Sequence, residues 1–177
     1  MANSRSRGSE SSHNFASIVL GLCLACLPAV SHAANNCAWL NEATASGFLG
    51  GDAVGTFTAA AAGQPAICAF VDQSAAATRT LRITVEVAAD PHARMMDALA
   101  RDCGADAAPL KAIGNEALVC AADDRKGGLG ERVVGRVRDQ VFTITIGTTL
   151  KGDPILTRDA LTAKIYSAAE QVSGNLF

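Results

Sequence analysis

Four arginines carry the most specific chemistry that this chain offers, because a guanidinium can hold a carboxylate or a phosphate through two parallel hydrogen bonds. They lie in segments where apolar and polar residues alternate, the pattern of a half-buried strand. The alternation predicts that the four share the outward face of a sheet, where they would hold a small anionic ligand or an acidic protein surface. The alternative is a solvated face balanced by Glu86 and Glu131. The residues expected on this face are Arg82, Arg132, Arg136 and Arg138, with Thr143 and Thr145 beside them.

The cysteine pattern indicates cross-linking rather than metal binding. Four of the six cysteines lie after residue 33, where a secretory signal peptide is expected to end. An even number of cysteines in an exported chain predicts disulfides. Three pairings are open. We favour Cys37–Cys68 with Cys103–Cys120, because each bond then joins a helix, or its flank, to a neighbouring strand. No C-x-x-C spacing occurs among these four, and thiolate ligands would be oxidised outside the cytoplasm, so no zinc site is expected.

Few residues could serve as catalysts. His92 is the one histidine after residue 33, so a nucleophile would have one candidate base, and no G-x-S-x-G motif is present. The Gly-rich run 126–130 lacks the Gly-Lys-Ser/Thr ending of a phosphate-binding loop. Asp123 and Asp124 lack the regular spacing of oxygen ligands for a cation. The sequence therefore assigns no catalytic, cofactor-binding or metal-binding residue, and no cofactor is expected.

The first 33 residues have the layout of a secretory signal peptide. Two arginines precede an almost wholly apolar run, 15–30, which is followed by small residues at Ser31 and Ala33, the positions that a signal peptidase reads. We expect cleavage after Ala33 and a periplasmic or secreted protein. Cys26 could accept a lipid, but the position three residues before it holds Cys23 in place of the usual Leu, which argues against an anchor.

Charge and length exclude several classes of partner. Lys and Arg number 15 against 17 Asp and Glu, a formal net charge of −2, so the chain lacks the basic excess of a nucleic-acid-binding protein. No apolar run reaches the roughly 20 residues of a membrane span. With 1–33 removed, about 144 of the 177 residues remain, which is enough for one domain, 34–177.

The hydrophobic pattern predicts an α+β fold. An antiparallel sheet of about five strands, with the helices packed on one of its faces and two disulfides, is expected because strands and helices do not alternate strictly. The third helix is expected to begin at Asp153-Pro154 and to end at Gly174. We expect helices at 42–49, 90–103 and 153–174, strands at 66–71, 80–88 and 117–122, a hairpin at 131–147 with its turn at Asp139-Gln140, and a candidate edge strand at 54–60.

A resemblance covers most of the chain after the leader. Residues 37–50 read Cys-x-x-Leu-Asn-Glu-Ala followed by Phe-Leu-Gly, which resembles the opening of small exported bacterial domains of uncharacterised function, many of them lipoproteins. Those domains also have a second cysteine in an early strand, as Cys68 is here, and segments like 113–117 and 136–146. The resemblance implies a sandwich akin to that of the Mog1 and PsbP group and no catalytic residues. This chain departs from the pattern in lacking a lipid-attachment motif.

Three functions are consistent with these observations. The leading hypothesis is an exported, non-catalytic domain that binds a protein or a small molecule through a sheet face or its flanking loops. The second is a cell-envelope hydrolase with a carboxylate or Ser site that spacing does not reveal, which would require a deep polar pocket. The third is an inhibitor or chaperone-like partner of another exported protein.

Overall fold

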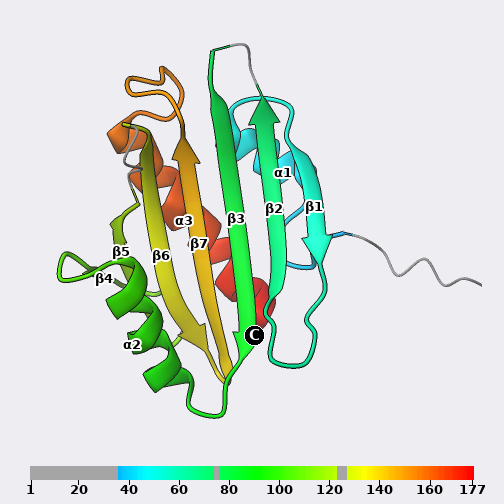
Figure 1. The fold of residues 1–177 in the computed structure, drawn as a ribbon, viewed down its shortest axis with the longest axis vertical. Helices are drawn as coiled ribbons and strands as arrows, with labels where there is room; N and C mark the ends of the chain where they lie inside the picture. The colour runs from blue at the N-terminus through cyan, green and yellow to red at the C-terminus, as the bar shows by residue number, and fades with distance from the viewer. Residues whose placement is uncertain (1–35, 74–75, 123–126) are drawn as a thin grey trace, which may run out of the picture. The chain divides into compact units, whose positions relative to one another are not determined.

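The computed structural model describes residues 36–73, 76–122 and 127–177, and the strands among them form one seven-stranded antiparallel sheet. The strand order across the sheet is β1-β2-β3-β7-β6-β5-β4 (Figure 1). The described residues all belong to the unit Ala33–Phe177. The strands are β1 (Val54–Thr58), β2 (Ala66–Gln73), β3 (Thr78–Val87), β4 (Ala108–Leu110), β5 (Glu116–Ala121), β6 (Leu129–Val137) and β7 (Gln140–Thr148).

The α+β class with an antiparallel sheet is confirmed, but the count of about five strands is too low. The two further strands, β1 and β4, lie at the two edges of the sheet. β1 corresponds to the candidate edge strand at 54–60. β4 has three residues and includes Pro109, so it is too short to show an alternating pattern. An edge strand pairs on one side only, which leaves its pattern weaker than that of a central strand.

The three helices among the described residues are α1 (Glu42–Leu49), α2 (Pro91–Asp102) and α3 (Arg158–Leu176). The first two begin at the expected caps. The Asn41 side chain accepts a hydrogen bond from the Thr44 amide at 2.8 Å, and the Asp90 side chain accepts one from the Ala93 amide at 2.9 Å. α1 ends at Gly50, whose φ of 75° is the left-handed conformation that glycine adopts without strain. No described helix combines the length and the apolar character that a membrane crossing needs.

The helices cover both faces of the sheet, so the expectation that they share one face is wrong. α1 and α3 pack on the face that we call the inner face, over a core that includes Leu81, Phe142 and Ile144. α2 packs on the opposite face, the outer face, where Met95 and Leu99 contact Val134 and Val141 (Figure 1). Consecutive residues of β6 and β7, such as Val141 and Phe142, are therefore both buried, one on each face.

The predicted ends of α3 and the predicted position of the β6–β7 turn are also wrong. α3 begins at Arg158, four residues after Pro154, with Thr157 as its cap, and it continues past Gly174 to Leu176. The β6–β7 turn lies one residue earlier than expected, at Arg138-Asp139, because Val137 pairs with Gln140. Arg138 adopts a φ of 54°, and its amide donates a hydrogen bond to the Asn115 side chain at 2.6 Å. This contact from the loop before β5 holds a turn that contains no glycine.

Candidate functional site

Three polar side chains form a row across the middle of the outer face. The strand register places Arg82 of β3 opposite Thr145 of β7, and Thr145 in turn opposite Arg132 of β6. Residues at paired positions project from the same face, so the two arginines stand on either side of a threonine. Two strand spacings put their backbones about 10 Å apart, a distance that two long side chains can close over Thr145.

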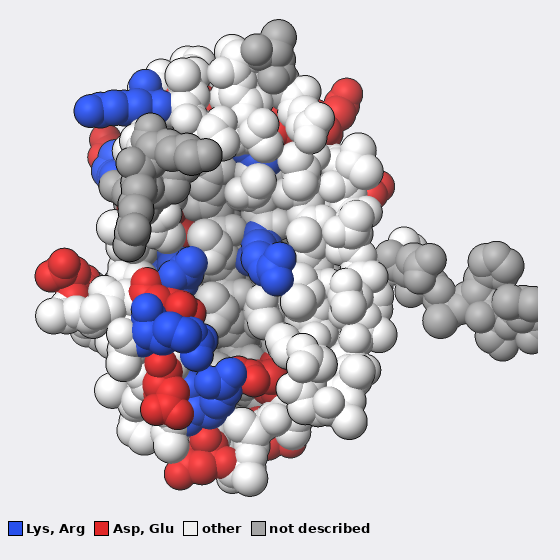
Figure 2. Space-filling view, in the orientation of Figure 1, with Lys and Arg blue, Asp and Glu red and all other residues white. Residues whose placement is uncertain are grey.

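Helix α2 turns this row into a cleft. The helix covers the outer face beside the row, and the cleft between the helix and the sheet has a volume of about 230 Å³. Figure 2 shows basic and acidic atoms intermixed over α2 and an isolated basic patch over the middle of the sheet. The sheet and α2 contribute most of the cleft lining, which consists of Pro65, Arg82, Thr84, Glu86, Arg94, Ala98, Arg101, Asp102, Arg132, Thr143 and Thr145.

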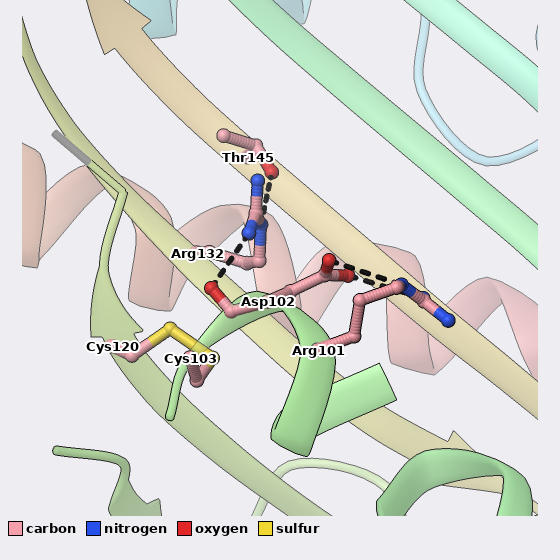
Figure 3. Close-up of a disulfide and its surroundings, with 6 residues drawn as sticks. All are labelled: Arg101, Asp102, Cys103, Cys120, Arg132 and Thr145. Carbon is pink, nitrogen blue, oxygen red and sulfur yellow. Dashed lines mark hydrogen bonds and ion pairs between the residues drawn. A yellow bond between two sulfur atoms is a disulfide. The ribbon is translucent and has the colours of Figure 1, made fainter. Parts of the chain in front are cut away.

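The Arg132 side chain is fixed in this cleft by two hydrogen bonds. Its Nε donates to Thr145 Oγ1 at 3.1 Å, and its Nη1 donates to the Asp102 carbonyl oxygen at 2.9 Å (Figure 3). The Asp102 carbonyl lies at the C-terminal end of α2, where unsatisfied carbonyl groups carry partial negative charge and favour a cation. Arg132 is therefore held in one orientation without a carboxylate partner among the residues that the structure describes.

The two carboxylates of the cleft are already paired with other arginines. Arg94 Nε lies 2.8 Å from Glu86 Oε1, and Arg101 donates to both carboxylate oxygens of Asp102, at 3.1 and 3.2 Å. Arg82 is exposed and forms no hydrogen bond or ion pair with any residue that the structure describes. These two ion pairs neutralise Glu86 and Asp102. The two positive charges that remain, those of Arg82 and Arg132, face the same cleft.

The structure separates the other two predicted arginines from this cleft. Arg136 also projects from the outer face, but the apolar contacts of α2 with Val134 and Val141 lie between it and the row. It pairs with Glu116 at 3.2 Å. Arg138 lies in the β6–β7 turn, with its guanidinium 5.7 Å from the centre of the Phe177 ring. The four predicted arginines thus divide into a pair in the cleft and two with separate contacts.

His92 contacts the same carboxylate as Arg136, that of Glu116. Its Nδ1 lies 3.1 Å from Glu116 Oε2, the same oxygen that Arg136 contacts. Burial by itself raises the pKa of Glu116, but hydrogen bonds from Arg136 and His92 outweigh this effect and lower the pKa. Within the described ranges, no hydroxyl or thiol group forms a hydrogen bond with His92, and no three His, Cys, Asp or Glu side chains gather as metal ligands would. The signal peptide expected at 1–33 and Asp123-Asp124 lie outside the described residues.

Both disulfides have the favoured pairing. Cys37 is bonded to Cys68 of β2, and Cys103, at the C-terminal end of α2, is bonded to Cys120 of β5. The second bond is part of the candidate site, because Cys120 pairs with Arg132 across β5 and β6 and Cys103 follows Asp102 (Figure 3). It fixes the end of α2 whose carbonyl group holds the Arg132 side chain.

Sequence reasoning missed a buried polar cluster at the other end of the sheet. Arg79 Nε donates to Asp153 Oδ2 at 2.8 Å, and Arg79 Nη1 donates to Asp72 at 2.9 Å. Asp153 also accepts from Thr148 Oγ1 at 2.7 Å. Burial by itself raises the pKa of Asp153, but these hydrogen bonds and those from two backbone amides outweigh it and hold the pKa far below its ordinary value. Arg79 lies two residues before the inward-facing Leu81 in β3, so its side chain projects from the same face of the sheet. This alternation was the signal that could have revealed the cluster.

Two larger hollows in the described structure lack convergent charge. One, of about 340 Å³, lies between α1 and β1 and has Glu42 as its one charged lining residue. The other, of about 420 Å³, has Trp39 in its wall and Glu86 as its one charged lining residue. A ligand site usually combines an enclosed volume with a few converging polar groups. Of these three hollows, the cleft between α2 and the sheet is the one with converging polar groups, so it is the candidate site.

Comparisons of the chain with protein-family models, with curated proteins and with solved structures found no match, so the resemblance to small exported domains stays an expectation.

Proposed function

We propose that this protein is an exported, disulfide-stapled domain without catalytic activity, and that it binds its ligand in the cleft between α2 and the outer sheet face. One observation carries the proposal: Arg82, which has no partner among the described residues, and Arg132, which is fixed by Thr145 and Asp102, face the same cleft. Two uncompensated cations that face one concave surface repel one another, and a bound partner would relieve this repulsion.

The two disulfides support the proposed location outside the cytoplasm. Disulfides form and persist in oxidising compartments such as the periplasm and the extracellular space, and they are rare in reducing ones. The expected signal peptide at 1–33 leads to the same location. We therefore propose a periplasmic or secreted protein.

The position of His92 supports a binding role over a hydrolytic one. A serine or thiol hydrolase needs a base within hydrogen-bond reach of its nucleophile. His92 is absent from the lining of the cleft, and its contact is with the Glu116 carboxylate. The groups that do line the cleft are arginines, threonines and paired carboxylates, which are suited to holding charge.

Protein-observed NMR with a library of small, chemically diverse fragments tests the location of the site without assuming a ligand. We expect the fragments that bind to shift amide resonances of β3, β6 and β7 around Arg82, Arg132 and Thr145. Fragments that bind only beside Glu42 and Phe70, in the hollow between α1 and β1, would show that the site is elsewhere. Turnover in a broad hydrolase screen that is lost in His92→Ala would contradict the non-catalytic role.

A further inference from the structure

We propose that the cleft binds a tetrahedral oxyanion with two negative charges, a phosphate or a sulfate group. This inference rests on the proposed function and adds the chemical class of the ligand. It follows from the hydrogen-bonding groups that remain available in the row of Arg82, Thr145 and Arg132 once the internal contacts have been assigned.

Each of the three side chains in this row keeps at least one free hydrogen-bond donor. Arg82 keeps all five N–H groups, since it has no partner among the described residues. Arg132 keeps both N–H groups of Nη2 and the second one of Nη1. Thr145 Oγ1 accepts from Arg132 Nε, so its hydroxyl hydrogen remains available to donate. These free donors outnumber the one acceptor left in the row, the second lone pair of Thr145 Oγ1, and this excess favours a group that only accepts hydrogen bonds, which an oxyanion does.

The charge of the cleft matches a dianion. Glu86 and Asp102 are each within 3.1 Å of an arginine nitrogen, so their charges are compensated inside the protein. The two remaining cations, Arg82 and Arg132, come from strands on either side of β7. A tetrahedral group has enough oxygens to meet donors from three adjacent strands, whereas a single planar carboxylate has two oxygens and one charge.

The size of the cleft limits the ligand to one such group. Small-molecule pockets usually measure about 300–1,000 Å³. At about 230 Å³ the cleft is smaller than this range, so it can hold an anionic group but not a whole drug-sized molecule. The source is therefore either a free inorganic anion or a phosphate or sulfate ester whose remaining part lies outside the cleft.

NMR titrations of the oxidised protein with sodium sulfate and with inorganic phosphate test this inference. Sodium chloride at equal ionic strength controls for screening of surface charge. We expect saturable shifts at Arg82, Thr145 and Arg132 with both dianions, weaker shifts with acetate, and no saturable shift with chloride. A titration with phenyl phosphate separates the two sources. Tighter binding than inorganic phosphate would indicate an ester, and equal or weaker binding would indicate the free anion.

Two arginine variants provide the matched comparison. Arg82→Gln should weaken sulfate binding about tenfold or more, since a hydrogen bond to a charged group is among the strongest single polar contacts. Arg138→Gln removes an exposed arginine outside the cleft and should leave the affinity unchanged. An unchanged spectrum away from position 82 would show that Arg82→Gln is folded.

Equal sulfate affinity in Arg82→Gln and the unmodified protein would overturn the inference, as would shifts that chloride reproduces or acetate binding tighter than sulfate. Fragments that bind in the cleft of a protein that ignores both dianions would refute the ligand class and leave the proposed function standing. The absence of both fragment and dianion binding at the cleft would refute both proposals.

Discussion

Replacing Asp153 with Asn tests how much the buried polar cluster contributes to stability. The Asp153 carboxylate is fully buried, and the Arg79 residue is 5% exposed. Arg79 Nε and Nη2 donate to the two carboxylate oxygens at 2.8 and 3.1 Å, a bidentate pair. The substitution keeps the size of the side chain but removes its charge, and it directs an NH₂ group toward donors. Arg79 then remains buried with one carboxylate, that of Asp72.

The structure sets the expected magnitude of this loss. Removing one partner of a buried ion pair destabilises a protein by about 3–5 kcal/mol. Two features favour the lower end of this range. Arg79 keeps Asp72 at 2.9 Å, and the amide oxygen of the new side chain can still accept from the Ile155 and Leu156 amides, as Asp153 Oδ1 does at 2.8 and 3.1 Å. We therefore expect a loss of about 3 kcal/mol, a large part of the roughly 5–15 kcal/mol by which domains are stable.

Urea unfolding of the oxidised protein at pH 7, followed by far-ultraviolet circular dichroism, measures this loss. Asp52→Asn is the control, since Asp52 is exposed and its side chain forms no hydrogen bond or ion pair with a described residue. We expect its free energy of unfolding to stay within about 0.5 kcal/mol of the unmodified value. A loss below about 1 kcal/mol in Asp153→Asn would refute the reasoning, because the buried charge of Arg79 would then need no second partner.

The same variant predicts a change in acid sensitivity. The pKa of Asp153 is lower in the folded protein than in the unfolded chain, so its contribution is complete above the ordinary carboxyl pKa of about 4 and is lost as the pH falls from there toward the folded pKa. The unmodified protein should therefore lose stability below about pH 4 more steeply than Asp153→Asn. Equal slopes in unfolding experiments at a series of acidic pH values would contradict this assignment.

Three further substitutions test the packing of the sheet and its second disulfide, each by urea unfolding. Met95→Ala should lose about 2–5 kcal/mol because Met95 is fully buried between α2 and the sheet, whereas Met96→Ala, at a residue 47% exposed, should lose less than about 1 kcal/mol. Similar losses would contradict the packing of α2 on the outer face. Gly135→Ala should lose about 1–3 kcal/mol, because its Cβ would lie 2.5 Å from the Phe142 ring, and an unchanged stability would show that the ring can move. Replacing Cys103 and Cys120 together with Ser opens a loop with a sequence separation of 17 and should lose about 3 kcal/mol, and an unchanged midpoint would show that the bond does not constrain the unfolded chain.

Local patterns in the sequence were enough to predict most of the elements. The caps Asn41 and Asp90 act within three residues of their amide partners, so the starts of α1 and α2 follow from short segments. Asp153 precedes Pro154 in the same way as Asp90 precedes Pro91, yet it does not begin a helix. Its main partner is Arg79, which is 74 residues away in the chain. A long-range ion pair therefore overrides a local helix-start signal, and a local pattern cannot reveal it.

The candidate site was predicted in part. Alternation along the strands placed Arg82 and Arg132 on one face, and the register of β3, β7 and β6 agrees with that placement. The position of α2 could not be predicted, because its apolar stripe shows that it packs on a sheet but not on which face. The adjacent buried pairs Val133-Val134 and Val141-Phe142 were a usable signal, since a strand that is apolar on both sides must be covered on both sides.

The contacts of α2 make the two arginines of the cleft unequal. Arg132 already donates to the helix end and to Thr145, and the Cys103–Cys120 bond fixes that helix end, so its side chain has little freedom left to lose when a ligand binds. Arg82 is exposed and keeps its full set of donors, since no described residue holds it. Arg132 would therefore determine where an anion sits, and Arg82 would close over it. If both arginines were paired to carboxylates, as Arg94 is to Glu86, the cleft would have no positive charge left for a ligand.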